Sequence, residues 1–179
     1  TLLHHLIEHS ASRDPDAGAL GADGATLSYG ALVQQVHACA GGLVALGTGR
    51  GDRAAISLDK RVETVVASFG AAAAGAVLVP VNPLLKAAQV NHILRDSGAR
   101  VLVTSQARLA ALGDVKGVCP ELLHVILVDG DAPGTRSWAH LLDVSSGAVH
   151  RVIDCDVAAI LYTSGTTGQP KGVVLSHAN

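Results

Sequence analysis

Apolar residues follow two different periods along the chain, and these periods predict helices and strands in alternation. In four stretches the apolar residues recur every three or four positions, as on one face of an amphipathic helix: 2–7, 32–43, 62–73 and 90–94. Six short runs have apolar centres, as buried strands do: 53–58, 77–81, 101–104, 123–128, 157–163 and 171–175. The alternation predicts an α/β fold, a mostly parallel sheet with helices on both faces.

Capping and turn-forming residues mark the ends of several of these elements. Ser28 stands just before the second helix pattern, where its hydroxyl can accept a hydrogen bond from a backbone N–H of the first turn. The pair Asp23-Gly24 indicates a hairpin between the short segments 17–21 and 25–27. Residues 47–52, although rich in glycine, are interpreted as a helix cap and turn, because a strand and not a helix follows them.

Composition limits the classes of partner. The 179 residues suffice for one ordinary domain, and 13 Lys+Arg against 15 Asp+Glu give a net charge of -2. No basic run interleaves with aromatic residues, so nothing favours nucleic acid. Cys39, Cys119 and Cys155 form neither a CxxC pair nor an even set, which predicts ordinary buried thiols in a reducing, cytoplasmic environment.

The longest uncharged run, residues 65–85, does not have the character of a membrane span. It is rich in alanine and is interrupted by glycines, prolines and an asparagine, whereas a spanning helix needs about 20 strongly apolar residues in succession. A short helix followed by a buried strand is the better interpretation. The N-terminus also lacks the basic and apolar segments of a signal peptide, so a protein without a membrane span is expected.

The eleven residues 162–172, YTSGTTGQPKG, carry most of the candidate chemistry. They place four hydroxyl side chains, three glycines, one proline and one lysine between two strand-like runs. Glycine lets a backbone turn tightly and approach a ligand, bared N–H groups and hydroxyls donate to phosphate oxygens, and lysine adds positive charge. This composition predicts a loop that binds a polyphosphate, most simply a nucleoside triphosphate.

Two other interpretations, a plain hairpin turn and a Walker-type loop, account less well for this segment. A plain hairpin turn needs only about two to five residues and no proline-lysine pair, so it explains the composition poorly. A Walker-type loop has the order GxxxxGK[ST] and leads into a helix, whereas Lys171 here follows Gly168 by three positions and leads into a predicted strand. The order of residues excludes a Walker loop.

Three further features invite functional readings, and each has a simpler structural one. His5 to His9 match the HxxEH pattern of zinc peptidases, but no third ligand is apparent, and surface polar residues are the better interpretation. His177 lies near the phosphate loop, yet Ser176 is expected to cap a helix that begins at His177, which makes it a first-turn residue. Trp138, the one tryptophan, is expected to anchor the core or a lid.

Residues 162–172, followed by VVLSHAN, resemble the phosphate-binding signature of the adenylate-forming, AMP-binding enzymes. These are acyl-CoA synthetases, luciferases and the adenylation domains of peptide synthetases. The segments 46–56, 66–83 and 93–104 also resemble successive N-terminal segments of that family in order and spacing. The resemblance covers nearly the whole chain, but only the opening part of the family's architecture.

The resemblance implies the roles of individual residues. Carried over position by position, the phosphate contacts fall on one group: Thr163, Ser164, Gly165, Thr166, Thr167, Gly168 and Lys171. Gly172 would permit the turn back into a strand. The implied reaction is attack of a carboxylate on the α-phosphate of ATP, with Mg²⁺ as the accompanying ion. Coenzyme A is the expected co-substrate of a second step, and ATP and a carboxylic acid are the expected partners.

The same resemblance limits what this chain can do. Residues 1–179 would be the N-terminal part of the large AMP-binding domain, and the catalytic lysine and the acidic magnesium ligand would lie beyond Asn179, so neither catalytic nor metal-binding residues are assigned here. Taken alone, the chain is expected to be nearly inactive and to expose strand edges that self-associate. Segment 79–83, with Asn82, looks more like acyl-CoA synthetases than amino-acid-activating domains. The alternative is a non-catalytic α/β binding or interaction module.

Overall fold

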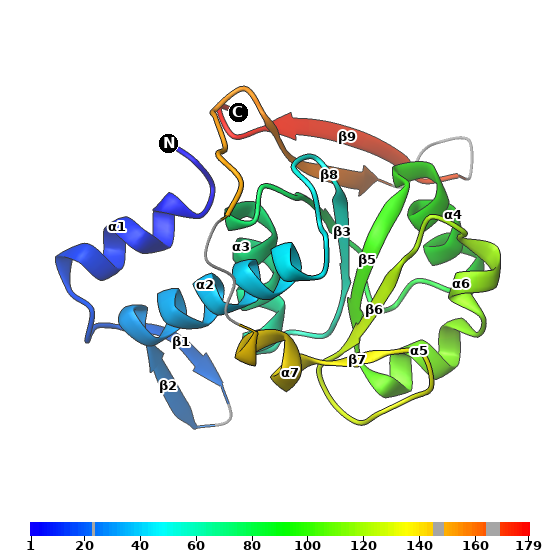
Figure 1. Cartoon of the computed structure of the whole chain (residues 1–179), viewed down its shortest axis with the longest axis horizontal. Helices are drawn as coiled ribbons and strands as arrows, with labels where there is room; N and C mark the ends of the chain where they lie inside the picture. Colours follow the sequence, from blue (N-terminus) through cyan, green and yellow to red (C-terminus); the bar gives the residue numbers. More distant parts are fainter. Residues whose placement is uncertain (23, 145–148, 164–168) are drawn as a thin grey trace.

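A seven-stranded sheet organises the protein (Figure 1). The structure, a computed structural model, describes residues 1–22, 24–144, 149–163 and 169–179. The strand order is β7-β6-β5-β3-β4-β8-β9, and every neighbouring pair is parallel except β8 with β9. The strands of this sheet are β3 (Arg53–Ser57), β4 (Val77–Pro80), β5 (Ala99–Thr104), β6 (His124–Leu127), β7 (Arg136–Ser137), β8 (Val157–Thr163) and β9 (Lys171–Ser176). The predicted α/β class with a mostly parallel sheet is confirmed.

Helices cover both faces of the sheet, as predicted. Figure 1 shows α2, α3 and α7 on one side of it and α4, α5 and α6 on the other. The helices in the described residues are α1 (His5–Arg13), α2 (Tyr29–Ala45), α3 (Val62–Ala73), α4 (Ala87–Ser97), α5 (Gln106–Leu112), α6 (Val115–Val118) and α7 (Trp138–Asp143). A separate antiparallel hairpin of β1 (Gly18–Ala22) and β2 (Ala25–Ser28) precedes α2, which the Ser28 hydroxyl caps by accepting from Ala31 N–H at 3.3 Å.

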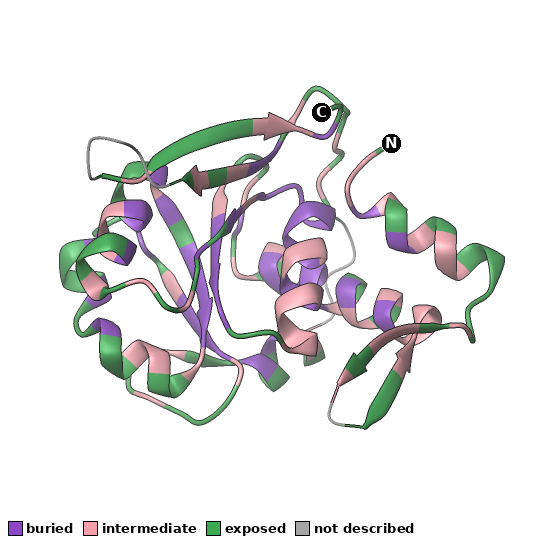
Figure 2. Cartoon of the chain, turned by 180° about the vertical axis from the view of Figure 1, so that it is seen from behind, coloured by how far each residue is buried: buried purple, intermediate pink, exposed green. Residues whose placement is uncertain are grey.

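The central strands feed two separate apolar cores. Because successive side chains of a strand point to opposite faces, Ala54 and Ile56 of β3 enter the core under α2 and α3, while Ala55 enters the core under α4. Leu102 of β5 likewise joins the second core, and Trp138 of α7 is buried in the first. The central sheet is therefore buried on both sides (Figure 2), which fixes its position against the helices.

Small residues let the helices on the first face pack closely. A Cβ at Gly70 of α3 would lie 2.6 Å from the Sγ of Cys39 in α2, so glycine is needed where the two helices cross. Burial raises the pKa of the Cys39 thiol to about 12, which makes it an inert core group. Cys119 is buried as well, but Cys155 is exposed, so the expectation of three buried thiols is wrong for Cys155.

The chain after β9 does not begin a helix, contrary to the sequence-based expectation for Ser176 and His177. Both the N–H and the hydroxyl of Ser176 donate to Asn179 Oδ1, at 2.7 and 3.0 Å, and residues 177–178 form a turn. His177 is buried, and its Nδ1 accepts from the N–H of Leu3 at 3.0 Å. Its role in this structure is therefore to hold the N-terminal segment against the end of β9.

Two smaller differences from the sequence-based expectations concern Leu6 and two short elements. Leu6, placed in the apolar stripe of the first helix, is 55% exposed, and Ile7 is the residue of α1 that is buried. The short elements α6 and β7 were not predicted. None of the helices in the described ranges has both the length and the apolar character needed to cross a membrane.

The N-terminal histidines make stability depend on pH. His4 is buried, with no hydrogen-bond partner for Nδ1 among the described residues. Desolvation lowers its pKa from 6.5 to about 4, although the negative charge of Glu8 acts to raise it. His5, His177 and His37 lower it further. Since the folded-state pKa lies below the unfolded one, the unfolded chain binds more protons between these two values, and stability falls as the pH falls through this window.

We expect His4 to remove up to about 3 kcal/mol of the free energy of unfolding as the pH falls from 6.5 to about 4. Urea unfolding at a series of pH values measures this. His4→Leu should flatten the pH dependence, whereas the control His9→Leu, at an exposed position of α1, should keep the slope of the parent chain. Equal slopes for the parent chain and His4→Leu would contradict the assignment.

Candidate functional site

The predicted phosphate loop connects β8 to β9 at the carboxyl end of β8. Because β8 runs parallel to β4, this end lies at the same edge of the sheet as the carboxyl ends of the other parallel strands, where open α/β sheets bind ligands. Thr163 ends β8 and Lys171 begins β9, and the two are register partners, both exposed. The structure therefore brings these two predicted phosphate contacts together. The other five, Ser164 to Gly168, lie outside the described residues.

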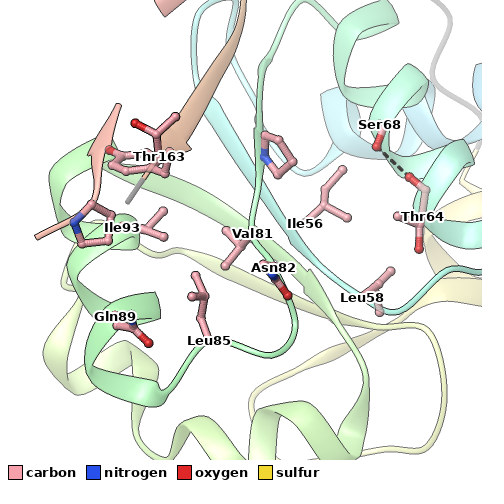
Figure 3. A pocket seen from close by; sticks show the side chains of 13 residues that line it. Ile56, Leu58, Thr64, Ser68, Val81, Asn82, Leu85, Gln89, Ile93 and Thr163 are labelled. Atoms are coloured by element: carbon pink, nitrogen blue, oxygen red, sulfur yellow. Dashed lines mark hydrogen bonds between the residues drawn. The ribbon is translucent and has the colours of Figure 1, made fainter. Parts of the chain in front are cut away.

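A cavity of about 560 Å³ lies beside both ends of this loop (Figure 3). Its wall combines the carboxyl ends of β3, β4 and β8 with the first turns of α3 and one side of α4. The lining residues are Ile56, Leu58, Thr64, Ser68, Pro80, Val81, Asn82, Leu85, Gln89, Ile93, Tyr162, Thr163 and Pro170. Thr163 and Pro170 flank the loop, so both described ends of the loop border this cavity.

The cavity wall is apolar, and several of its polar groups are engaged locally. The Ser68 hydroxyl donates to the carbonyl of Thr64 at 2.7 Å, the Thr64 hydroxyl donates to the carbonyl of Asp59 at 2.6 Å, and Asn82 Oδ1 accepts from Leu84 N–H at 2.9 Å. The lining residues include no carboxylate, imidazole or amine. The lining residues thus supply mainly shape and hydrogen bonds, and the phenol of Tyr162 among them donates its proton to a hydrogen bond with Asp96.

Gly172 is explained by its cross-strand neighbour. It pairs with Tyr162 in the β8–β9 ladder, and a Cβ built on it would lie 2.8 Å from Ile160 Cγ2 and 3.2 Å from Tyr162 Cζ. The resemblance implies that Gly172 permits a turn, but its φ does not lie in the left-handed region. A turn therefore does not explain the glycine at this position. The absence of a side chain leaves space for the ring of Tyr162 over the strand pair.

Two side chains of α4 contact the segments on either side of the loop. The Tyr162 hydroxyl donates to Asp96 Oδ2 at 2.5 Å, and His92 Nε2 lies 3.0 Å from the carbonyl oxygen of Pro170. Sequence reasoning missed both residues of α4. Their spacing of four places them on one face of a helix, but only the order of strands in the sheet sets that face against the loop.

The HxxEH segment adopts a helix, and its residues are drawn into local contacts. The rings of His5 and His9 are 5.7 Å apart, and His9 is exposed. Ligand atoms of His4, His5 and Glu8 lie within 4.8 Å of one another. Glu8 Oε1 is 2.7 Å from His37 Nε2, however, and His5 Nδ1 accepts from Leu2 N–H at 3.4 Å. These contacts give Glu8 and His5 structural partners, and we assign no metal to the cluster.

The close approach over Gly172 predicts a specific sensitivity. Gly172→Ala should lower the free energy of unfolding by about 1 to 3 kcal/mol, because Ile160 and Tyr162 must shift to admit the methyl group. Gly21→Ala in β1 is the matched control, since nothing lies within 4 Å of a Cβ at that position, and it should be close to neutral. Urea unfolding compares the two, and equal effects would refute the explanation.

Comparison with known proteins places this arrangement in a family. Residues 7–179 match the family described as AMP-binding enzyme. The chain is 36% identical over 180 residues to the L-proline–(L-prolyl-carrier protein) ligase of Pseudomonas fluorescens. The aligned region covers 99% of this chain and 35% of that protein. It is 34% identical over 160 residues to the long-chain-fatty-acid–CoA ligase FadD13 of Mycobacterium tuberculosis, and the aligned region covers 84% of this chain and 30% of that protein. The chain thus spans about a third of the length of these relatives.

A solved structure agrees with these sequence matches. The anthranilate CoA ligase AuaEII in complex with anthranoyl-AMP superposes with a TM-score of 0.92 and 26% sequence identity, over 99% of this chain and 35% of that one. The superposition includes the parallel sheet that carries the loop between β8 and β9. From its signature at residues 162–172, its fold and these matches, we conclude that this chain belongs to the AMP-binding enzyme family, among relatives that are adenylate-forming synthetases and acyl-CoA ligases.

Proposed function

We propose that the protein containing this chain activates a carboxylic acid with ATP. A carboxylate oxygen forms a bond to the α-phosphorus, the bond from that phosphorus to the oxygen that bridges to the β-phosphate breaks, and pyrophosphate leaves with the electron pair. The product is an acyl-adenylate. The observation that carries this proposal is the signature at 162–172, with Thr163 and Lys171 paired beside a cavity at the carboxyl edge of the sheet.

The role that we propose for this chain is to hold the leaving group. Hydroxyl and N–H donors of residues 163–168 and the ammonium group of Lys171 would bind the β- and γ-phosphates and stabilise the charge that develops on them. No acid or base is required from this loop, because pyrophosphate is already a good leaving group when its charge is neutralised. Residues 1–179 would then be the N-terminal part of a larger AMP-binding domain, in keeping with their share of the relatives' length.

Magnesium commonly accompanies such nucleotides, and the described site does not offer the ligands that it prefers. Mg²⁺ binds carboxylate and phosphate oxygens, and none of the residues that line the cavity is acidic. We therefore derive no step through Mg²⁺ from this chain. Any Mg²⁺ would be held by the phosphates of the nucleotide and by carboxylates outside the described site.

The exchange of labelled pyrophosphate into ATP, dependent on a carboxylic acid, tests the proposal in the full-length protein. Lys171→Ala and Thr167→Val should each reduce the exchange rate at least about tenfold, since each removes a contact to the developing charge. Lys171→Arg should retain more activity than Lys171→Ala. Lys60→Ala, at an exposed lysine outside the cavity, is the control and should leave exchange unchanged.

The same assay separates the proposal from its alternative, a non-catalytic interaction module. That alternative is favoured by the exposed apolar side chains of the last two strands, Val157, Leu161, Val173 and Val174, which are 37 to 59% exposed. An intact full-length protein with no exchange for any acid tested would support the module. Exchange that is active but indifferent to Lys171 and Thr167 would overturn the roles assigned to the loop.

We further propose that the acyl group is transferred to the thiol of coenzyme A. The sulfur forms a bond to the acyl carbon, the bond from that carbon to the phosphate oxygen breaks, AMP leaves with the electron pair, and the thiol proton is released to solvent. The support is the segment 79–83, which resembles acyl-CoA synthetases, and the neutral amide of Asn82 at the wall of an apolar cavity. An aspartate could accept the same hydrogen bond from Leu84, so Asn82 differs from it mainly in leaving the cavity uncharged.

Measurement of thioester formation tests the choice of acceptor. With the preferred acid and ATP, the full-length protein should produce acyl-CoA when coenzyme A is supplied, and little thioester when a phosphopantetheinylated carrier protein replaces it. Thioester on the carrier protein alone would refute the acceptor, while acid-dependent pyrophosphate exchange would still support adenylation.

A further inference from the structure

The hairpin that carries the phosphate loop is joined to the rest of the sheet by little backbone pairing. The parallel ladder between β4 and β8 has one register pair, Leu78 with Ala159, whereas β3 and β4 share four. β9 is the edge strand and is exposed along most of its length (Figure 2). Side-chain contacts must therefore contribute to the position of this hairpin.

One such contact secures the start of β8. Arg50 Nη2 and Nε donate to the two carboxylate oxygens of Asp156 at 2.6 and 3.0 Å, and this bidentate pair ties the residue before β8 to the turn before β3. The guanidinium of Arg50 lowers the pKa of Asp156 from its usual value, so the carboxylate remains ionised at neutral pH. This pair lies at the opposite end of β8 from the phosphate loop and does not fix the loop.

At the loop end, α4 supplies contacts to both flanking segments. The carbonyl of Pro170 can only accept, so the contact at 3.0 Å requires that His92 carries its proton on Nε2 and donates it. The phenol of Tyr162 donates to Asp96, and burial together with this bond raises the pKa of Tyr162, which keeps the hydroxyl protonated. His92 and Asp96 are one turn apart, so a single face of α4 holds the residue before the loop and the residue at its end.

The helix that makes these contacts is itself firmly placed. Val90, Ile93 and Leu94 are buried in the second core, on the side of α4 that faces the sheet. Its C-terminal end is held by Arg53 of β3, which donates to the carbonyls of Ser97 and Gly98, both at 2.6 Å. Because α4 is fixed to the central strand, a bond to α4 places the hairpin relative to the whole sheet.

We propose that His92 and Asp96 are positioning residues, which set the two ends of the phosphate loop through Pro170 and Tyr162. This inference rests on the proposed function, since it assigns the loop to the phosphates of ATP. Neither residue would touch the nucleotide. Their effect is to hold Thr163 and Lys171 at the separation and orientation that the phosphates require. A displacement of these two residues by about 1 Å would remove that contribution.

The first test measures the anchoring itself in the chain of residues 1–179, by amide hydrogen exchange of β8 and β9. Tyr162→Phe, Asp96→Leu and His92→Leu should each speed exchange at the loop ends of these strands about three- to tenfold, the loss of one hydrogen bond. Asp96→Asn and His92→Gln should restore slow exchange, because an amide can accept from Tyr162 and donate to Pro170. His140→Leu, at an exposed position of α7, is the control and should change nothing.

The second test measures the consequence for the reaction in the full-length protein. The same three variants should raise the KM for ATP about three- to tenfold and leave the KM for the acid within about twofold, and the two amide variants should restore both values. A double-mutant cycle should show that Tyr162→Phe and Asp96→Leu are not additive, since they break one bond, whereas Tyr162→Phe and His92→Leu are closer to additive.

Each outcome decides between distinct claims. Unchanged hydrogen exchange in all three variants overturns the positioning role, whatever the protein does with ATP. Faster hydrogen exchange with an unchanged KM for ATP also overturns the positioning role, because the contacts would then be merely structural. If Lys171→Ala leaves pyrophosphate exchange intact, it is the proposed function of the loop that fails. A protein that needs both the anchors and Lys171 supports both proposals.

Discussion

Parallel pairing of β3 with β4 on one side and β5 on the other is the constraint on which the rest of the structure depends. Parallel strands must be connected by crossovers, which here are the helices α3 on one face and α4 on the other, and each crossover buries one set of alternate side chains from β3. The same constraint collects the carboxyl ends of the strands at one edge. The cavity and the loop after β8 are found at that edge, where open α/β sheets bind ligands.

The antiparallel pair β8 and β9 departs from this pattern. It is the part of the site with the least backbone pairing to the rest of the sheet. The inner strand β3 is paired with β4 on one side and β5 on the other, whereas β8 meets β4 at one register pair and β9 has no neighbour beyond it in the described sheet. The position of the hairpin then depends on side-chain interactions as well: the Arg50–Asp156 pair at the start of β8, and the contacts of His92 and Asp96 at the loop end. Such an arrangement would couple the placement of the predicted phosphate contacts to the packing of α4.

The sequence was sufficient for those features that follow from local periodicity and capping. Apolar periods located helices α1 to α4 and the strands of the sheet other than β7, and Ser28 identified the start of α2. It was insufficient where a side chain has meaning only through a distant partner. His177 is expected in the first turn of a helix, yet its Nδ1 accepts from the N–H of Leu3 near the other end of the chain, and the close approach of Tyr162 that explains Gly172 depends on strand pairing. Of the predicted phosphate contacts, Thr163 and Lys171 were found side by side, and Ser164 to Gly168 stay a prediction.

The chemistry proposed for this loop explains why positioning residues would matter so much in it. A general acid or base tolerates small displacements through a bridging water, but a loop that stabilises charge on a leaving diphosphate acts only through the placement of its donors. Hydrogen bonds to such a group gain strength when they are held in advance, because no reorganisation is then needed as the charge develops. Rigid supports at both ends of the loop, anchored by α4 to the central strand through Arg53, would meet that requirement without adding any reactive group to the site.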